Sequence, residues 1–281
     1  MIWKEVGRMY FVTFSEMTGT NGEKIAKQTA ASLGYTFFGE EELVRFSHEM
    51  GFLHDVKKLD EKSPTFFERL FSEKPKIYLD RLQSVIYEAA KKGNTVFFGR
   101  GSQLMLKPFE CALHVLVTGS HERRIARVME ENHADRAIAE KIIERSDHDR
   151  SGFIRFAYGE DWLNPRLYDL IINTDKTSVN SGAMMVVDAA KSEEIKACGI
   201  DSVNALGRLS LQRKIESVLL ETGVLSPHLF VDVEDMDQVR LFGVAGSAEE
   251  KQLVEKTVRT VPGVKRIEND ISVFRGAMTG A

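Results

Sequence analysis

Apolar runs of strand length alternate with stretches of helical periodicity along the first two thirds of the chain. The apolar, β-rich run at residues 9–14 ends in the turn-forming residues 15–22, which predicts a strand followed by a loop. From Glu23 to Leu33 the apolar positions fall on one helical face, and Gly34 stands where a glycine often ends a helix. The predicted order is therefore strand, glycine-containing loop and helix.

The same alternation continues as far as residue 173. We expect further strands at 35–38, 95–98, 114–118 and 170–173, and helices at 77–92 and 120–132. Strands and helices that alternate at this spacing predict a parallel sheet with helices on both faces. The predicted fold class is α/β, with ligands expected at the carboxyl ends of the strands.

The pattern changes after Ala190. Residues 191–204 are charged or small and lack a clear period, which predicts a linker. Beyond them the pattern predicts helices at 209–220 and 248–261 and strands at 229–233, 239–241 and 264–274. Two helices and three strands suffice for a small α+β domain. We expect a first domain at 1–190, a linker at 191–204, a second domain at 205–275 and a tail at 276–281.

Composition narrows the class of protein further. The chain has 281 residues, of which 43% are hydrophobic and 28% charged, as in a packed globular protein. Its 38 basic and 42 acidic residues give a net charge of −4, so bulk charge predicts no nucleic-acid partner. No stretch approaches the ~20 apolar residues of a membrane span, and no secretion signal or CxxC motif is visible. A cytoplasmic location is expected.

The first loop, residues 18–24, lies where phosphate-binding loops lie, between the first strand and the first helix. Backbone N–H groups and the helix dipole attract anions at that place. The Walker pattern GxxxxGK followed by Ser or Thr is nevertheless absent, because no lysine follows Gly22 directly. The residues alone therefore leave two interpretations open, a phosphate-binding loop and an ordinary turn between strand and helix.

Arginines recur between residues 100 and 155. Arg100 stands between two glycines at the predicted carboxyl end of a strand, and Arg124, Arg127, Arg150 and Arg155 follow in charged segments. Guanidinium groups suit phosphate contacts and phosphoryl transfer. Solvent-exposed arginine on a helix is the simpler interpretation for each of them, and it explains Arg100 least well. The seven histidines have no metal-ligand spacing, so no metal site is expected.

Four segments together resemble the cytidylate kinase-like family of P-loop nucleoside monophosphate kinases. They read VTFSEMTGTNGEKIAKQTAASLGYTFFGEEEL, VFFGRG, HVLVTGSHERRIARVMEE and SDHDRSGFIRFAYGEDW with NPRLYDLIINT. The family loop typically reads SREFGSGGREIA, without the Walker lysine, and Gly22 agrees with it. Two departures stand out, because Glu16 replaces an arginine and Asn21 replaces a glycine. Both put charge or bulk where phosphates bind, so we expect slow phosphoryl transfer.

The resemblance implies roles for particular residues. The donor nucleotide, ATP with Mg²⁺, is expected at the first loop, at Ser15, Thr18, Gly19, Thr20, Asn21, Gly22, Glu23 and Lys24. Arg100 is expected to bind the phosphate of the acceptor. Catalytic charge neutralisation is expected from Arg124 and Arg127 on the helix before the lid and from Arg150 and Arg155 in the lid.

Residues 206–274 resemble a BON domain, with VRLFGVAGS and GVKRIEND as the most similar segments. The resemblance implies a binding module for a small ligand, a membrane surface or a protein partner. The sequence is consistent with three functions. The first is phosphorylation of a cytidylate-like nucleoside monophosphate, with the BON domain regulating or localising it. The second is nucleotide sensing without turnover, and the third is binding by the BON domain beside a structural first domain.

Overall fold

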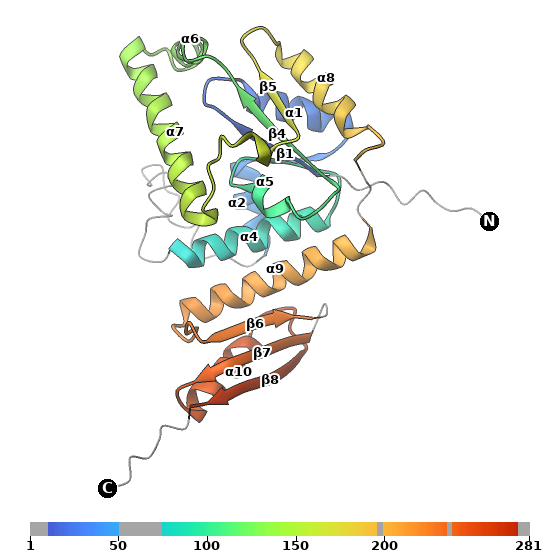
Figure 1. Ribbon diagram of the computed structural model, residues 1–281, viewed down its shortest axis with the longest axis vertical. Coiled ribbons are helices and arrows are strands. Elements are labelled where there is room, and N and C mark those ends of the chain that lie inside the picture. Colours follow the sequence, from blue (N-terminus) through green and yellow to red (C-terminus); the bar gives the residue numbers. More distant parts are fainter. Residues whose placement is uncertain (1–10, 51–74, 196–198, 235–237, 275–281) are drawn as a thin grey trace, which may run out of the picture. The chain divides into compact units, whose positions relative to one another are not determined.

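The computed structural model describes residues 11–50, 75–195, 199–234 and 238–274 (Figure 1). Contacts between residues divide the chain into two compact units. The first holds a five-stranded parallel sheet of order β2-β3-β1-β4-β5, and the second a three-stranded sheet of order β6-β7-β8. Among the described residues, no helix has the length and apolar character of a membrane span.

The strands of the first unit follow the predicted alternation, and the predicted fold class is confirmed. Their bounds are β1 (Phe11–Glu16), β2 (Thr36–Phe38), β3 (Thr95–Phe98), β4 (Ala112–Thr118) and β5 (Leu170–Asn173). The helices are α1 (Gly22–Leu33), α2 (Glu40–Glu49), α5 (Ser102–Leu106), α6 (His121–Asn132), α7 (Arg136–Tyr158) and α8 (Val179–Ala190), with a 3-10 turn at Pro165–Leu167. The sequence pattern did not predict α2, α5 or α7. Residues 9 and 10 of the first predicted strand lie outside the described residues.

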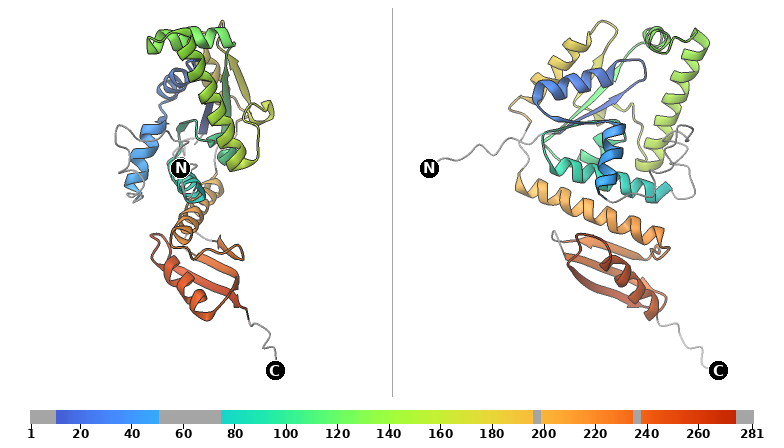
Figure 2. Two further views of the ribbon diagram at one scale, coloured as in Figure 1. Left: turned by 90° about the vertical axis from the view of Figure 1, so that its left-hand side faces the viewer. Right: turned by 180° about the vertical axis from the view of Figure 1, so that it is seen from behind.

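Alternation along the strands gives the sheet two apolar faces. Val12 and Phe14 of β1 belong to one cluster with Ile25 of α1 and Val186 of α8, so these two helices cover one face (Figure 2). On the other face, Phe97 of β3 stacks on Phe38 of β2 at a centroid distance of 5.6 Å, and Phe38 contacts Phe46 of α2. Burial on both faces holds the strands in register, so that their carboxyl ends form one edge.

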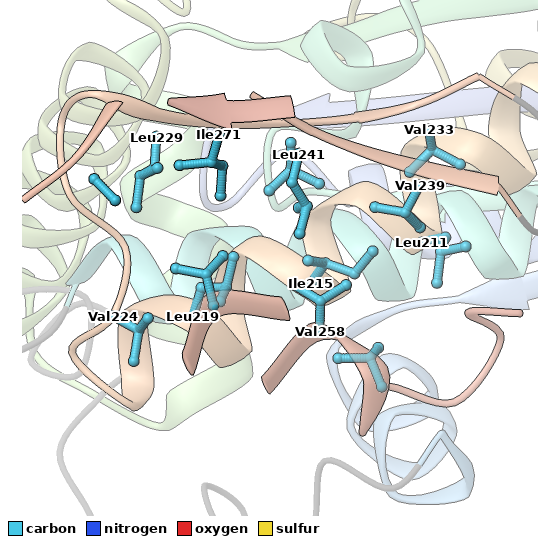
Figure 3. Close-up of a cluster of buried hydrophobic side chains, with 14 residues drawn as sticks. Leu211, Ile215, Leu219, Val224, Leu229, Val233, Val239, Leu241, Val258 and Ile271 are labelled. Carbon is cyan, nitrogen blue, oxygen red and sulfur yellow. The ribbon is translucent and has the colours of Figure 1, made fainter. Parts of the chain in front are cut away.

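The second unit contains α9 (Ile200–Glu221), β6 (Leu229–Val233), β7 (Gln238–Ala245), α10 (Ala248–Arg259) and β8 (Arg266–Val273). Strands β6 and β7 are antiparallel, and β7 and β8 are parallel. Alternate residues of the strands point to one core with Leu211, Ile215 and Leu219 of α9 and with Val258 of α10 (Figure 3). The predicted small α+β domain is confirmed. Helix α9 begins inside the segment expected as a linker.

Helix α4 (Pro75–Lys91) also packs in the second unit, although it lies far from α9 in the sequence. The hydroxyl of Ser84 donates to the carbonyl oxygen of Ser210 at 2.9 Å, and the hydroxyl of Ser210 donates to the carbonyl oxygen of Ser84 at 3.1 Å. Arg81 pairs with Glu221 at 2.6 Å. These contacts place a helix of the first predicted domain beside α9. Whether residues 1–190 and 205–275 fold separately stays a prediction.

A buried carboxylate at this helix pair makes stability depend on pH. The side chain of Asp80 is buried, and its Oδ1 lies 3.6 Å from Nη1 of Arg213, which approaches Glu216 more closely, at 2.7 Å. Burial, with a smaller contribution from Glu216, raises the pKa of Asp80 to about 6. The folded state therefore binds the proton more tightly than the unfolded state. Stability falls as pH rises from the unfolded pKa through about 6.

We predict that Asp80→Asn removes this pH dependence. At pH 8 the variant should be more stable than the native chain, by on the order of 2 kcal/mol, and at pH 4 the two should be nearly equal. Chemical unfolding followed by circular dichroism at both pH values measures the difference. Asp232→Asn, which changes an exposed aspartate of β6, is the matched control. An unchanged difference between the native chain and Asp80→Asn across this pH range contradicts the prediction.

Candidate functional site

The first loop joins the carboxyl end of β1 to the N-terminus of α1 in a conformation that glycine and asparagine favour. Gly19 has φ 84°, and a Cβ placed on it would lie 2.7 Å from the carbonyl oxygen of Arg124, so no larger residue fits. Asn21 has φ 60° and is the N-cap of α1. Its Oδ1 accepts a hydrogen bond from Lys24 Nζ at 2.9 Å. Asn21 thus adopts a left-handed backbone that glycine accepts readily.

The carboxylate of Glu16 is hydrogen-bonded inside this loop. Its Oε2 accepts the backbone N–H of Gly22 at 2.7 Å and the hydroxyl of Thr20 at 3.2 Å. A Cβ on Gly22 would lie 2.6 Å from the same oxygen, so only glycine allows this approach. Burial raises the pKa of Glu16, against the opposing effects of Arg150 and of the hydrogen bonds from Gly22 and Thr20. The start of α1 therefore already holds an acidic group.

Two arginines of α6 donate to carbonyl oxygens of the loop. Arg124 is buried, and its Nε donates to the carbonyl oxygen of Thr18 at 2.7 Å while Nη2 donates to both carboxylate oxygens of Asp147 at 2.8 Å. Arg127 donates to the carbonyl oxygen of Gly19 at 3.3 Å and to Thr174 at 2.6 and 2.7 Å. Both guanidinium groups thus hold the backbone of the loop.

Helix α7 contributes further contacts to the same loop. Arg150 donates to the carbonyl oxygen of Glu16, and its guanidinium lies 5.0 Å from the ring centroid of Trp162. The hydroxyls of Ser146 and Thr18 are 2.6 Å apart. The structure therefore brings Arg124, Arg127 and Arg150 to one loop.

The other predicted residues lie in different surroundings. Arg100 has φ 61° between two left-handed glycines, and its Nη2 pairs with Glu40 at 2.6 Å. Lys24 pairs with Glu131 of α6 at 2.5 Å, and the exposed Glu23 pairs with Lys27 at 2.8 Å. The remaining two are the buried Ser15 and the exposed Arg155.

Three contact residues were not singled out from the sequence. Asp147 and Ser146 lie on α7, whose charged sequence hides which side faces the loop. Thr174 follows β5. Knowledge of the strand order β1-β4-β5 would have placed it near the loop that follows β1. Within the described part of the chain, no group of three histidine, cysteine, aspartate or glutamate side chains could hold a metal ion.

The parallel sheet, the glycine-containing loop between β1 and α1, and the arginines of α6 and α7 define a P-loop kinase-like fold. The chain belongs to the cytidylate kinase-like family, whose family model matches residues 11–176. Residues 209–274 match the BON domain. Both resemblances inferred from the sequence are confirmed.

Several solved structures are similar to this chain at low sequence identity. An uncharacterized protein from Eubacterium ventriosum is 21% identical, with a TM-score of 0.53, and the alignment covers 66% of this chain and 99% of that one. A shikimate kinase from Bacteroides thetaiotaomicron is 13% identical with a TM-score of 0.42, covering 66% and 99% of the two chains. A gluconokinase from Sinorhizobium meliloti is 10% identical with a TM-score of 0.40, covering 65% and 95%. The search of curated proteins gave no significant match.

We predict that Arg124→Ala destabilises the fold, because it leaves Asp147 and the carbonyl oxygen of Thr18 without their donor. Loss of a charged hydrogen-bonded group of this kind costs about 1.5–3 kcal/mol. Urea unfolding of the full chain measures the loss. Arg123→Ala, which truncates the exposed neighbour on the same helix, should change stability by less than about 0.5 kcal/mol. Equal small effects of the two substitutions contradict a bracing role for Arg124.

Proposed function

We propose that this protein binds a nucleotide at the first loop and transfers a phosphoryl group slowly from ATP to a cytidylate-like nucleoside monophosphate. The observation that carries the proposal is the 2.7 Å hydrogen bond from Gly22 N–H to a carboxylate oxygen. It supports anion binding at the N-terminus of α1, because the backbone N–H groups and the helix dipole at that place also favour phosphate. Membership of the cytidylate kinase-like family supports the choice of substrate class.

The contacts suggest a division of roles among the arginines. Arg124 and Arg127 hold carbonyl oxygens of the loop, so we assign them to positioning. Arg150 lies at Glu16 and is the lid arginine best placed to neutralise transferred charge. We assign the acceptor phosphate to Arg100. ATP would bring Mg²⁺ with its phosphates.

A second function, nucleotide sensing without turnover, is favoured by Glu16. A carboxylate beside bound phosphates opposes them by like-charge repulsion. In this alternative, nucleotide binding would be signalled through the BON domain, in a cytoplasmic setting. Calorimetric titration of nucleotides with Mg²⁺, followed by a coupled assay with ATP and CMP, tests both functions. Binding with turnover supports the kinase, binding without turnover supports the sensor, and no binding rejects both.

Binding by the BON domain beside a structural first domain is the third candidate. The outward face of its sheet carries Phe230 and Phe242, which are 51% and 38% exposed and stack at a centroid distance of 5.4 Å. Arg240 lies 5.8 Å from the Phe242 ring centroid. Aromatic rings exposed beside a charged group are typical of contact surfaces for a ligand, membrane or protein. Failure of the full chain to bind any nucleotide would favour this candidate.

We predict that Arg100→Ala weakens CMP binding about tenfold, because a charge-assisted phosphate contact is lost. Glu40→Gln removes the carboxylate partner of Arg100 and keeps its shape, so it should leave CMP binding unchanged or strengthen it. Calorimetry on the full chain measures both. Parallel weakening in the two variants would indicate that Arg100 serves only its ion pair with Glu40.

A further inference from the structure

We propose that Glu16 is an internal occupant of the phosphate loop, and that a nucleotide binds only after the Glu16 carboxylate leaves the N–H of Gly22. The inference rests on the proposed function, because it concerns regulation of the same loop. A phosphate that enters the loop must therefore displace the Glu16 carboxylate. The evidence comes from the contacts of Glu16, the charge of its carboxyl group and the way the loop backbone is held.

The contacts show that Glu16 uses the donors that a phosphate needs. Its Oε2 takes the N–H of Gly22, the first residue of α1, at 2.7 Å, and also the hydroxyl of Thr20. Phosphates bind at helix N-termini through such N–H groups. The single N–H of Gly22 already donates a short hydrogen bond of 2.7 Å to Glu16 Oε2. Carboxylate and phosphate are therefore mutually exclusive at this N–H.

Charge leads to the same conclusion. An ionised carboxylate a few ångströms from a polyphosphate repels it, and the repulsion is strong where water is partly excluded. Lys24 does not offset it from within the loop, because its ammonium pairs with Asn21 and Glu131. Arg150 donates to the backbone of Glu16 and is the cation whose charge stabilises the carboxylate. Departure of the carboxylate would leave Arg150 beside an incoming phosphate.

The carboxylate loses hydration where it lies in the loop. Burial is the largest cause of the raised pKa of Glu16, against the opposing effects of Arg150, Gly22 and Thr20. Movement of the side chain into solvent recovers that hydration. We therefore expect that phosphate can displace the Glu16 carboxylate.

The loop backbone is held by contacts that do not involve the Glu16 carboxylate. Carbonyl oxygens of residues 16, 18 and 19 accept hydrogen bonds from Arg150, Arg124 and Arg127. The side chain of residue 16 can therefore move or be replaced while these contacts keep the loop in shape. Substitutions of Glu16 test occupancy of the loop and leave its fold in place.

The experiment is calorimetric titration of the full chain with ATP and Mg²⁺, and separately with inorganic tripolyphosphate. Glu16→Gln keeps an oxygen that can accept the N–H of Gly22 but removes the charge, and Glu16→Ala removes both. We expect affinity to rise at least tenfold in Glu16→Gln and further in Glu16→Ala, for both ligands. Glu130→Gln, which removes an exposed carboxylate of α6, is the control and should leave affinity unchanged.

Each outcome bears on the inference or on the proposed function. Unchanged or weaker affinity in both Glu16 variants overturns the inference, and weakening only with Mg²⁺ present would make Glu16 a metal ligand instead. An equal gain in Glu130→Gln attributes the effect to bulk charge and also overturns it. If neither ligand binds to the native chain or to any folded variant, the proposed function fails and the inference fails with it. Circular dichroism establishes that each variant is folded.

Discussion

The buried guanidinium of Arg124 is the group on which the candidate site depends. A guanidinium keeps its charge in the interior, so it is tolerated there only where anionic and carbonyl oxygens surround it. Arg124 binds both carboxylate oxygens of Asp147 and the carbonyl oxygen of Thr18. These partners belong to α7 and to the first loop, so one charge joins α6, α7 and the loop. The position of Arg150 at Glu16 depends on the same arrangement, because Arg150 lies one turn of α7 beyond Asp147.

Most of the fold could be predicted from the sequence because its signals are local. The apolar run of β1, the turn-forming loop and the periodicity of α1 are properties of neighbouring residues, and the structure reproduces their order. Helix α7 was not predicted, because its local signal is weak. Only Ala139, Ile143, Phe153 and Ile154 of its 23 residues are buried, so it has no continuous apolar stripe. A helix held by polar contacts to a loop carries little periodic signal.

Partners that lie far apart in the sequence could not be predicted. The sequence indicated arginines for the site, but not that Arg124 would be neutralised by Asp147 on another helix, 23 positions away. Helix α4 was predicted from its periodicity, yet its packing on α9 depends on Ser84 meeting Ser210, 126 positions away. Periodicity identifies the face of a helix that is buried and leaves the partner of that face undetermined. Such pairings are set by tertiary packing.

The backbone and the side chain of the first loop contribute separately to the effect of Glu16. Backbone N–H groups and the helix dipole favour an anion at the start of α1 whichever side chain stands at position 16. Glu16 supplies a carboxyl oxygen there from the chain itself. In the proposed competition, a carboxylate that belongs to the chain has a high effective concentration at the loop, which an external phosphate would have to overcome. Burial raises the pKa of Glu16 because it removes part of the hydration of the carboxylate. If the proposal holds, occupancy of the loop is a balance between the carboxylate and phosphate, and the absence of a Walker lysine alone does not determine it.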